Sequence, residues 1–134
     1  MSNKKLGNEF ENELAELLDK KGFWVHLLNQ NKSGQPADMI AAINKKAFLI
    51  DAKVCSNNKF DLTRIEENQH LAMEKWQECV NTVGWFALKL DSGIYMLSYK
   101  KLKELMNDYT ILPKELIPRY GVELELWIEV NLII

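Results

Sequence analysis

The sequence predicts an α/β fold in which a central mixed β-sheet is flanked by helices. Two stretches with the 3.6-residue period of amphipathic helices, near residues 3–20 and 63–80, alternate with short apolar runs of strand length. Several of these runs are apolar on both faces, which is typical of strands that are covered on each side. The predicted order of elements is α-β-β-β-α-β-β-α-β, of which the first seven form the core.

The first helix is predicted from about Asn3 or Asn8 to Lys20, because apolar residues recur along one face and a glycine follows as a stop signal. This apolar stripe consists of Phe10, Leu14, Leu17 and Leu18. A strand is then expected at residues 23–28. Residues 29–36 are polar and contain glycine and proline, which predicts a loop.

The middle of the chain predicts a hairpin followed by a second long helix. Residues 39–43 and 47–54 are apolar runs on either side of a polar Asn-Lys-Lys turn. The second helix is expected to begin near Thr63, which has capping-box spacing with Glu66, and to continue to about Val80.

The rest of the chain predicts a second hairpin, a short helix and a final strand. Residues 85–90 and 94–99 flank an Asp-Ser-Gly turn, and a helix is expected over about 100–106. Apolar residues largely alternate with polar ones over 122–132, which predicts the final strand. No repeat or long linker interrupts the sequence, so residues 1–134 are predicted to form a single domain.

The composition is typical of a soluble globular protein. Of 134 residues, 47% are hydrophobic and 27% are charged, which excludes the disordered and fibrous classes. No apolar run approaches the roughly 18 residues that span a bilayer, and the N-terminus lacks a signal-peptide apolar region, so a cytoplasmic location is expected. Cys55 and Cys79 have no partners at zinc-finger spacing and are expected to be reduced thiols.

The charges are unevenly distributed along the chain, whose formal net charge is -2. Residues 1–64 hold ten Lys and Arg against eight Asp and Glu, or +2, whereas residues 65–134 hold seven against eleven, or -4. The basic excess therefore lies in the half that holds the strongest candidates for a site. A bound metal ion would also offset several of the acidic charges.

The first predicted hairpin brings two acids and a lysine together. If its turn has two residues, paired residues have numbers that sum to 89, which sets Asp38 opposite Asp51. Their side chains would start about 5 Å apart. Lys53 projects from the same face as Asp51, because side chains alternate along a strand. The simpler alternative is a structural ion pair between Asp51 and Lys53.

This group of side chains predicts metal-dependent phosphodiester chemistry. Two carboxylates so close repel each other, and a divalent cation between them removes the conflict. Oxygen ligands without Cys or His favour Mg²⁺ or Mn²⁺ over zinc. The lysine can orient or deprotonate an attacking water, or stabilise charge that develops on a phosphoryl oxygen.

Further candidates come from helical geometry. Glu11 borders the apolar stripe of the first helix on one side and Glu13 borders it on the other, so either could be a helix acid of the site. Gln69 lies near the middle of the second helix's stripe, where a buried amide requires partners. It could contact the site lysine or a water, or be a satisfied core residue. We interpret His26 and His70 as surface or packing residues.

Several short motifs resemble the PD-(D/E)XK nuclease superfamily. They are Gly7-Asn-Glu-Phe-Glu11, Pro36-Ala-Asp38, Asp51-Ala-Lys53 and Asn68-Gln69. The Gly-x-x-Phe-Glu opening, the Ser-Gly before Pro-Ala-Asp and the Phe-x-Leu before the glutamine helix are similar to Holliday junction resolvases of the RecU and archaeal Hjc types. The likeness covers about residues 5–99. The chain has Asp51 where Glu is commoner, and the junction-wedging insertion of RecU is short or absent.

The resemblance implies a restriction-endonuclease-like fold and an enzyme that hydrolyses DNA with Mg²⁺, or Mn²⁺, leaving a 5′-phosphate. It implies branched DNA as substrate and a homodimer that cuts two strands symmetrically. The implied catalytic residues are Glu11, Asp38, Asp51, Lys53 and Gln69, and the implied metal ligands are Glu11, Asp38 and Asp51.

The DNA contacts expected from the sequence are basic residues and one loop serine. They are Lys4, Lys5, Lys32, Ser33, Lys45, Lys46, Lys59 and Arg64. Two other functions stay open: another endonuclease of the superfamily, of restriction or repair type, and a nuclease fold that only binds DNA or protein.

Overall fold

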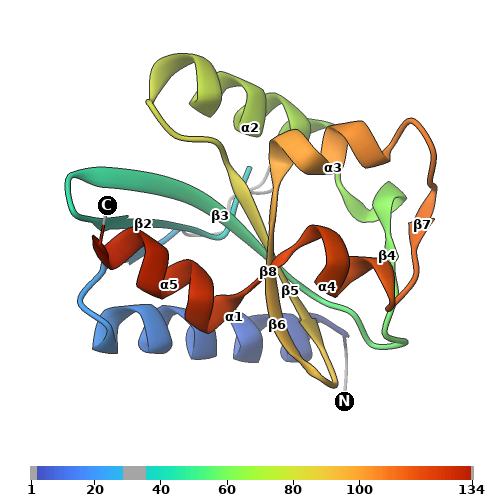
Figure 1. The fold of residues 1–134 in the computed structure, drawn as a ribbon, viewed down its shortest axis with the longest axis horizontal. Coiled ribbons are helices and arrows are strands. Elements are labelled where there is room, and N and C mark those ends of the chain that lie inside the picture. The colour runs from blue at the N-terminus through green and yellow to red at the C-terminus, as the bar shows by residue number, and fades with distance from the viewer. Residues whose placement is uncertain (1–2, 29–35, 134) are drawn as a thin grey trace.

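The protein folds as a twisted β-sheet between two layers of helices (Figure 1). The computed structural model describes residues 3–28 and 36–133. The helices are α1 (Asn3–Lys20), η1 of 3-10 type (Leu62–Arg64), α2 (Glu67–Cys79), α3 (Tyr99–Leu105), α4 (Leu116–Tyr120) and α5 (Leu124–Ile133). The strands are β1 (Trp24–Leu27), β2 (Met39–Ile43), β3 (Lys46–Val54), β4 (Phe60–Asp61), β5 (Trp85–Leu90), β6 (Gly93–Ser98), β7 (Ile111–Leu112) and β8 (Val122–Glu123).

The main sheet is mixed, as predicted. Its strand order is β1-β2-β3-β5-β6-β8, in which β3 and β5 are parallel and the other neighbours are antiparallel. Side chains of α1 and α5 share one buried cluster with one face of this sheet, and those of α2, α3 and α4 share another with the opposite face. No helix among the described residues is long and apolar enough to cross a membrane. The α/β class is therefore confirmed.

The register of the first hairpin is confirmed. Met39 pairs with Ile50, so paired numbers sum to 89. Asn44 and Lys45 form the turn with φ of 51° and 65°, the left-handed pair that a type I′ hairpin turn requires. This turn fixes which residues of β2 and β3 share a face, and it thereby places Asp38 beside Asp51.

The second helix was predicted to begin near Thr63, but α2 begins at Glu67. Asp61 accepts hydrogen bonds from the backbone N and Oγ1 of Thr63, both through Oδ1, and this closes the short turn η1. Ile65 is buried with extended backbone, so the helix restarts after it. The capping box consists of Glu66 and Gln69 rather than Thr63 and Glu66.

The predicted C-terminal strand is wrong, because all but its first residues form α5. Apolar residues in this segment recur both at the alternating positions of a strand and at the spacing of one face of a helix. The buried residues follow the helix period, and they are Leu124, Trp127, Ile128 and Asn131. The residues that completed the alternation, Leu126, Val130 and Leu132, are 53%, 42% and 44% exposed. The two-stranded sheet of β4 and β7 and the helix α4 were not predicted.

Replacing Trp127 with Ala is expected to lower the free energy of unfolding by about 3–5 kcal/mol. Its ring lies 5.8 Å from that of Phe23, 5.1 Å from Phe48 and 5.7 Å from Trp85, so it packs α5 against strands β3 and β5 and against the residue before β1. Urea denaturation measures the loss. Leu126→Ala, at an exposed position of the same helix, should change stability by less than about 0.5 kcal/mol. If Trp127→Ala and Leu126→Ala lowered the free energy of unfolding equally, this packing of Trp127 would be contradicted.

Candidate active site

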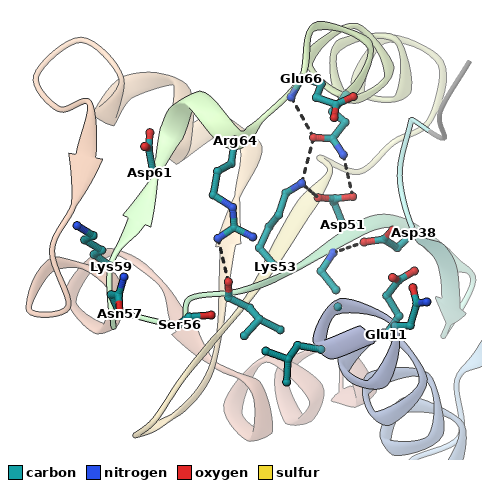
Figure 2. A pocket seen from close by; sticks show the side chains of 16 residues that line it. Glu11, Asp38, Asp51, Lys53, Ser56, Asn57, Lys59, Asp61, Arg64 and Glu66 are labelled. Atoms are coloured by element: carbon teal, nitrogen blue, oxygen red, sulfur yellow. Dashed lines mark hydrogen bonds and ion pairs between the residues drawn. The ribbon is translucent and has the colours of Figure 1, made fainter. Parts of the chain in front are cut away.

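A pocket of about 700 Å³ opens between the start of α1, the end of β3 and the start of α2 (Figure 2). Glu11, Asp38, Asp51, Lys53 and Gln69, the catalytic residues implied by the sequence, all line it. They come from α1, from the residue before β2, from β3 and from α2. The structure thus brings together residues that are up to 58 positions apart in the chain (69 minus 11).

Asp38 is held by the backbone of β3. Its N–H donates to the carbonyl of Ile50 at 3.1 Å, and its Oδ2 accepts from the backbone N of Ala52 at 2.7 Å. These two bonds lie on either side of Asp51, so the two aspartates face each other across the strand pair. Asp38 is 8% exposed and Asp51 is 1% exposed.

Gln69 connects Asp51 to Lys53. Its Nε2 donates to Oδ1 of Asp51 at 3.3 Å, and its Oε1 accepts from Nζ of Lys53 at 3.3 Å and from the backbone N of Glu66 at 3.1 Å. The Nζ also lies 3.1 Å from Oδ2 of Asp51, an ion pair without hydrogen-bond geometry. The buried glutamine predicted from the sequence therefore contacts both Asp51 and Lys53.

The charge of Asp38 disfavours the ionisation of both Glu11 and Asp51. The pKa of Glu11 is raised to about 7, mostly by burial and then by the charge of Asp38, against the lowering effect of Lys53. Burial raises the pKa of Asp51 well above its usual value, again with a contribution from Asp38 and against the effect of Lys53. Asp38 lies between the other two acids, and one lysine does not neutralise all three.

Of the two helix acids, the structure places Glu11 at the pocket. Glu13 points elsewhere and forms an ion pair with Lys89, with 2.6 Å between Nζ and Oε1. His26 is exposed and stacks on Trp24, as expected of a surface residue.

The predicted basic contacts are dispersed. Lys59 and Arg64 line the pocket, and exposed Lys5 directly precedes the pocket-lining start of α1. Lys45 and Lys46 lie at the far end of the hairpin, roughly 20 Å along the strand from Asp51. Lys46 instead donates to Asn131 of α5 at 3.2 Å. Lys32 and Ser33 lie outside the described residues, as does the side chain of Lys4.

Nearly the whole chain matches a known protein family. The profile of the archaeal Holliday junction resolvase family, Hjc, matches residues 2–132. The chain belongs to the Hjc family. This confirms the resemblance drawn from the motifs at residues 7–11, 36–38, 51–53 and 68–69.

The chain is also similar to a solved structure and to a bacterial protein. The Hjc of Archaeoglobus fulgidus, a Holliday junction resolvase from an archaeal hyperthermophile, superposes with a TM-score of 0.71 at 17% identity, over 92% of this chain and 98% of that one. This likeness confirms the fold. The UPF0102 protein FN1370 of Fusobacterium nucleatum subsp. nucleatum is 38% identical over 61 residues, or 45% of this chain. The match spans only half the length of that relative, 50%.

The residues of this Hjc pocket fit a divalent ion. Oδ2 of Asp51 is buried and accepts no hydrogen bond, and the neighbouring Asp38 makes a second negative charge costly. Within residues 3–28 and 36–133, no three Asp, Glu, His or Cys side chains form a complete ligand group by themselves. Mg²⁺ needs no such group, because it usually takes one or two carboxylates and completes its shell with water and substrate phosphate.

Sequence reasoning missed part of the Hjc pocket. Asn8, Ser56, Asn57, Asp61 and Glu66 line it and were not among the candidates. A signal existed for Ser56 and Asn57, because Ser-Asn-Asn one residue after a strand is typical of a polar turn at a strand end.

Replacing Glu11 with Gln is expected to stabilise the metal-free protein at pH 8 but not at pH 5. The pKa of Glu11 is raised in the folded state, so its contribution to stability is present below pH 4.5 and is lost as the pH rises through about 7. Gln removes the ionised form, and we expect the Tm at pH 8 in EDTA to rise by about 2–5 °C, limited by solvent screening.

The matched control for this change is Glu13→Gln, two residues away on α1. Its carboxylate is paired with Lys89, so its removal should not raise the Tm at pH 8. Equal shifts for the two variants at pH 8 would show that Glu11 is not under special electrostatic stress.

Proposed function

We propose that this chain is a Mg²⁺-dependent endonuclease that cleaves Holliday junctions and related branched DNA. The observation that carries the proposal is the convergence of Asp38, Asp51 and Lys53 on one end of the pocket, held by Gln69 and bordered by Glu11. Family membership supports the substrate, and residues 1–134 are proposed to act as one domain.

In this proposal each side chain has a separate task. Asp38 and Asp51 would hold the ion, with Glu11 beside them, and Mg²⁺ would supply Lewis-acid polarisation of the phosphate. Lys53 donates toward the phosphoryl oxygen on which charge develops. Glu11, with a pKa near 7, can exchange a proton with water at neutral pH. Gln69 is a positioning residue that orients the lysine.

The proposed products are those that the family resemblance implies. Attack of water on phosphorus with loss of the 3′-oxygen leaves a 5′-phosphate and a 3′-hydroxyl. Two such cuts placed symmetrically across a junction require two active sites, for which we propose a homodimer. Lys5, Lys59 and Arg64, near or at the pocket, are the proposed backbone contacts, and DNA binding should weaken as salt rises.

The test uses labelled four-way junctions, flaps and linear duplexes that share the same arm sequences. With Mg²⁺, the wild-type protein should nick the junction at symmetrical positions and leave ligatable 5′-phosphate ends, and EDTA should stop it. Preferential cleavage of linear duplex would favour a restriction or repair endonuclease. Binding of DNA without cleavage in either Mg²⁺ or Mn²⁺ would favour a non-catalytic module and would contradict the proposal.

A further inference from the structure

The pocket continues beyond the catalytic residues to a polar turn at the end of β3. Ser56, Asn57 and Lys59 are exposed on this turn and line the side of the pocket opposite Asp38 (Figure 2). From Asp51 to the start of the turn, the chain covers roughly 13 Å at the rise of a β-strand. The turn is therefore too remote to contact the same phosphate as the metal acids.

The turn is fixed by a reciprocal pair of hydrogen bonds. Asn58 has a φ of 54°, a left-handed conformation that asparagine tolerates better than most residues. Its Nδ2 donates to Oδ2 of Asp91 at 2.9 Å, and its Oδ1 accepts from the backbone N of Asp91 at 2.9 Å. Asp91 lies in the turn between β5 and β6, so a single amide joins two loops that are 33 residues apart.

Arg64 extends the same rim. One guanidinium N–H donates to the carbonyl of Val54 at 2.8 Å, and Cζ lies 5.9 Å from the ring centre of Phe60. Guanidinium has five N–H donors, so most stay available to a ligand. The nearby acid, Asp61, caps η1 through its Oδ1, which bonds Thr63.

The two halves of the pocket differ in charge. On the catalytic side, the four carboxylates of Glu11, Asp38, Asp51 and Glu66 face one lysine, or -3 when all are ionised. On the turn side, Lys59 and Arg64 face Asp61, or +1. A backbone phosphate without a metal ion is therefore favoured on the turn side and disfavoured on the catalytic side.

We propose that Ser56, Asn57, Lys59 and Arg64 form a subsite for a second backbone phosphate of the DNA strand whose scissile phosphate lies at Asp51. The Asn58–Asp91 pair positions this subsite. The proposal rests on the proposed function. The separation of roughly 13 Å corresponds to about two nucleotides of B-form strand, because successive phosphates are displaced around the helix as well as roughly 3.4 Å along its axis. The subsite therefore selects polynucleotides over mononucleotides.

The test exchanges the side-chain amide of Asn58 with the carboxylate of Asp91. Asn58→Asp sets two carboxylates against each other and should raise the Kd for a labelled four-way junction, measured by anisotropy in Ca²⁺, about ten-fold. The double variant Asn58→Asp, Asp91→Asn restores one amide and one carboxylate and should bring the Kd back to within about two-fold of wild type. Lys59→Ala should reduce the slope of log Kd against log salt by about one.

The control is Asn107→Asp, which adds the same charge at an exposed position between α3 and β7 and should leave the Kd within about two-fold. The Tm of every variant shows whether it folds. If the wild type binds the junction but Asn58→Asp leaves the Kd unchanged and Lys59→Ala leaves the salt slope unchanged, the subsite alone is overturned. A Kd that the exchange does not rescue would overturn the positioning role. Absence of DNA binding by wild type would overturn the proposed function as well.

Discussion

Replacing Asp51 with Asn is expected to lower the single-turnover rate of junction cleavage in Mg²⁺ by about a thousand-fold. The amide is isosteric, and its oxygen can still accept from Nε2 of Gln69, which now bonds Oδ1 of the aspartate. The variant loses the negative charge that attracts a divalent ion and that pairs with Lys53 at 3.1 Å. Quenched-flow or manual sampling, with the protein in excess of the labelled junction and above the Kd, measures the chemical step.

Asp108→Asn is the matched control for this change. Asp108 is exposed between α3 and β7, away from the pocket, so the same loss of charge should alter the rate by less than about two-fold. If folded Asp51→Asn kept more than about a tenth of the wild-type rate, cleavage would have to occur at another site.

Replacing Lys53 with Ala is expected to lower the same rate by about a hundred- to a thousand-fold while junction binding in Ca²⁺ is retained. Lys53 is the basic group closest to Asp51, and Gln69 holds it in place at 3.3 Å. Lys53 lowers the pKa of Asp51, so its removal raises that pKa further. Divalent ions should then raise the Tm of the variant only at higher pH than they do for wild type.

The comparison for this prediction is Lys103→Ala. Lys103 is a surface lysine of α3 that forms an ion pair with Glu74 at 2.8 Å, and its loss should leave the cleavage rate within about two-fold. A Lys53→Ala variant that cleaves at the wild-type rate would show that the lysine is only a structural partner of Asp51, the simpler interpretation of this pair.

The parts of the site that are local to the hairpin could be predicted from the sequence. Asp38 and Asp51 face each other because a two-residue turn leaves only one register, and the alternation of side chains then places Lys53. Gln69 could be recognised because it interrupts an apolar stripe. Glu11 and Glu13 could not be separated, since both border the stripe of α1 and only the packing of the helix on the sheet decides between them.

Other features depend on tertiary contacts that a sequence pattern does not contain. The sequence after Val122 is apolar at almost every second position, and the ring contacts of Trp127 decide in favour of a helix. Helix α2 begins later than predicted because Asp61 caps a separate turn, η1, before it. Lys45 and Lys46 belong to the hairpin of β2 and β3, but they lie at the end opposite Asp38 and Asp51.

The most direct test of the account is to locate a bound metal ion. Crystals of the wild-type protein soaked in Mn²⁺ should give an anomalous difference peak in contact with the carboxylates of both Asp38 and Asp51, and the peak should be absent from crystals of Asp51→Asn. Anomalous peaks only at other positions, in a protein that cleaves junctions in Mn²⁺, would contradict the assignment of this pocket as the metal-dependent active site.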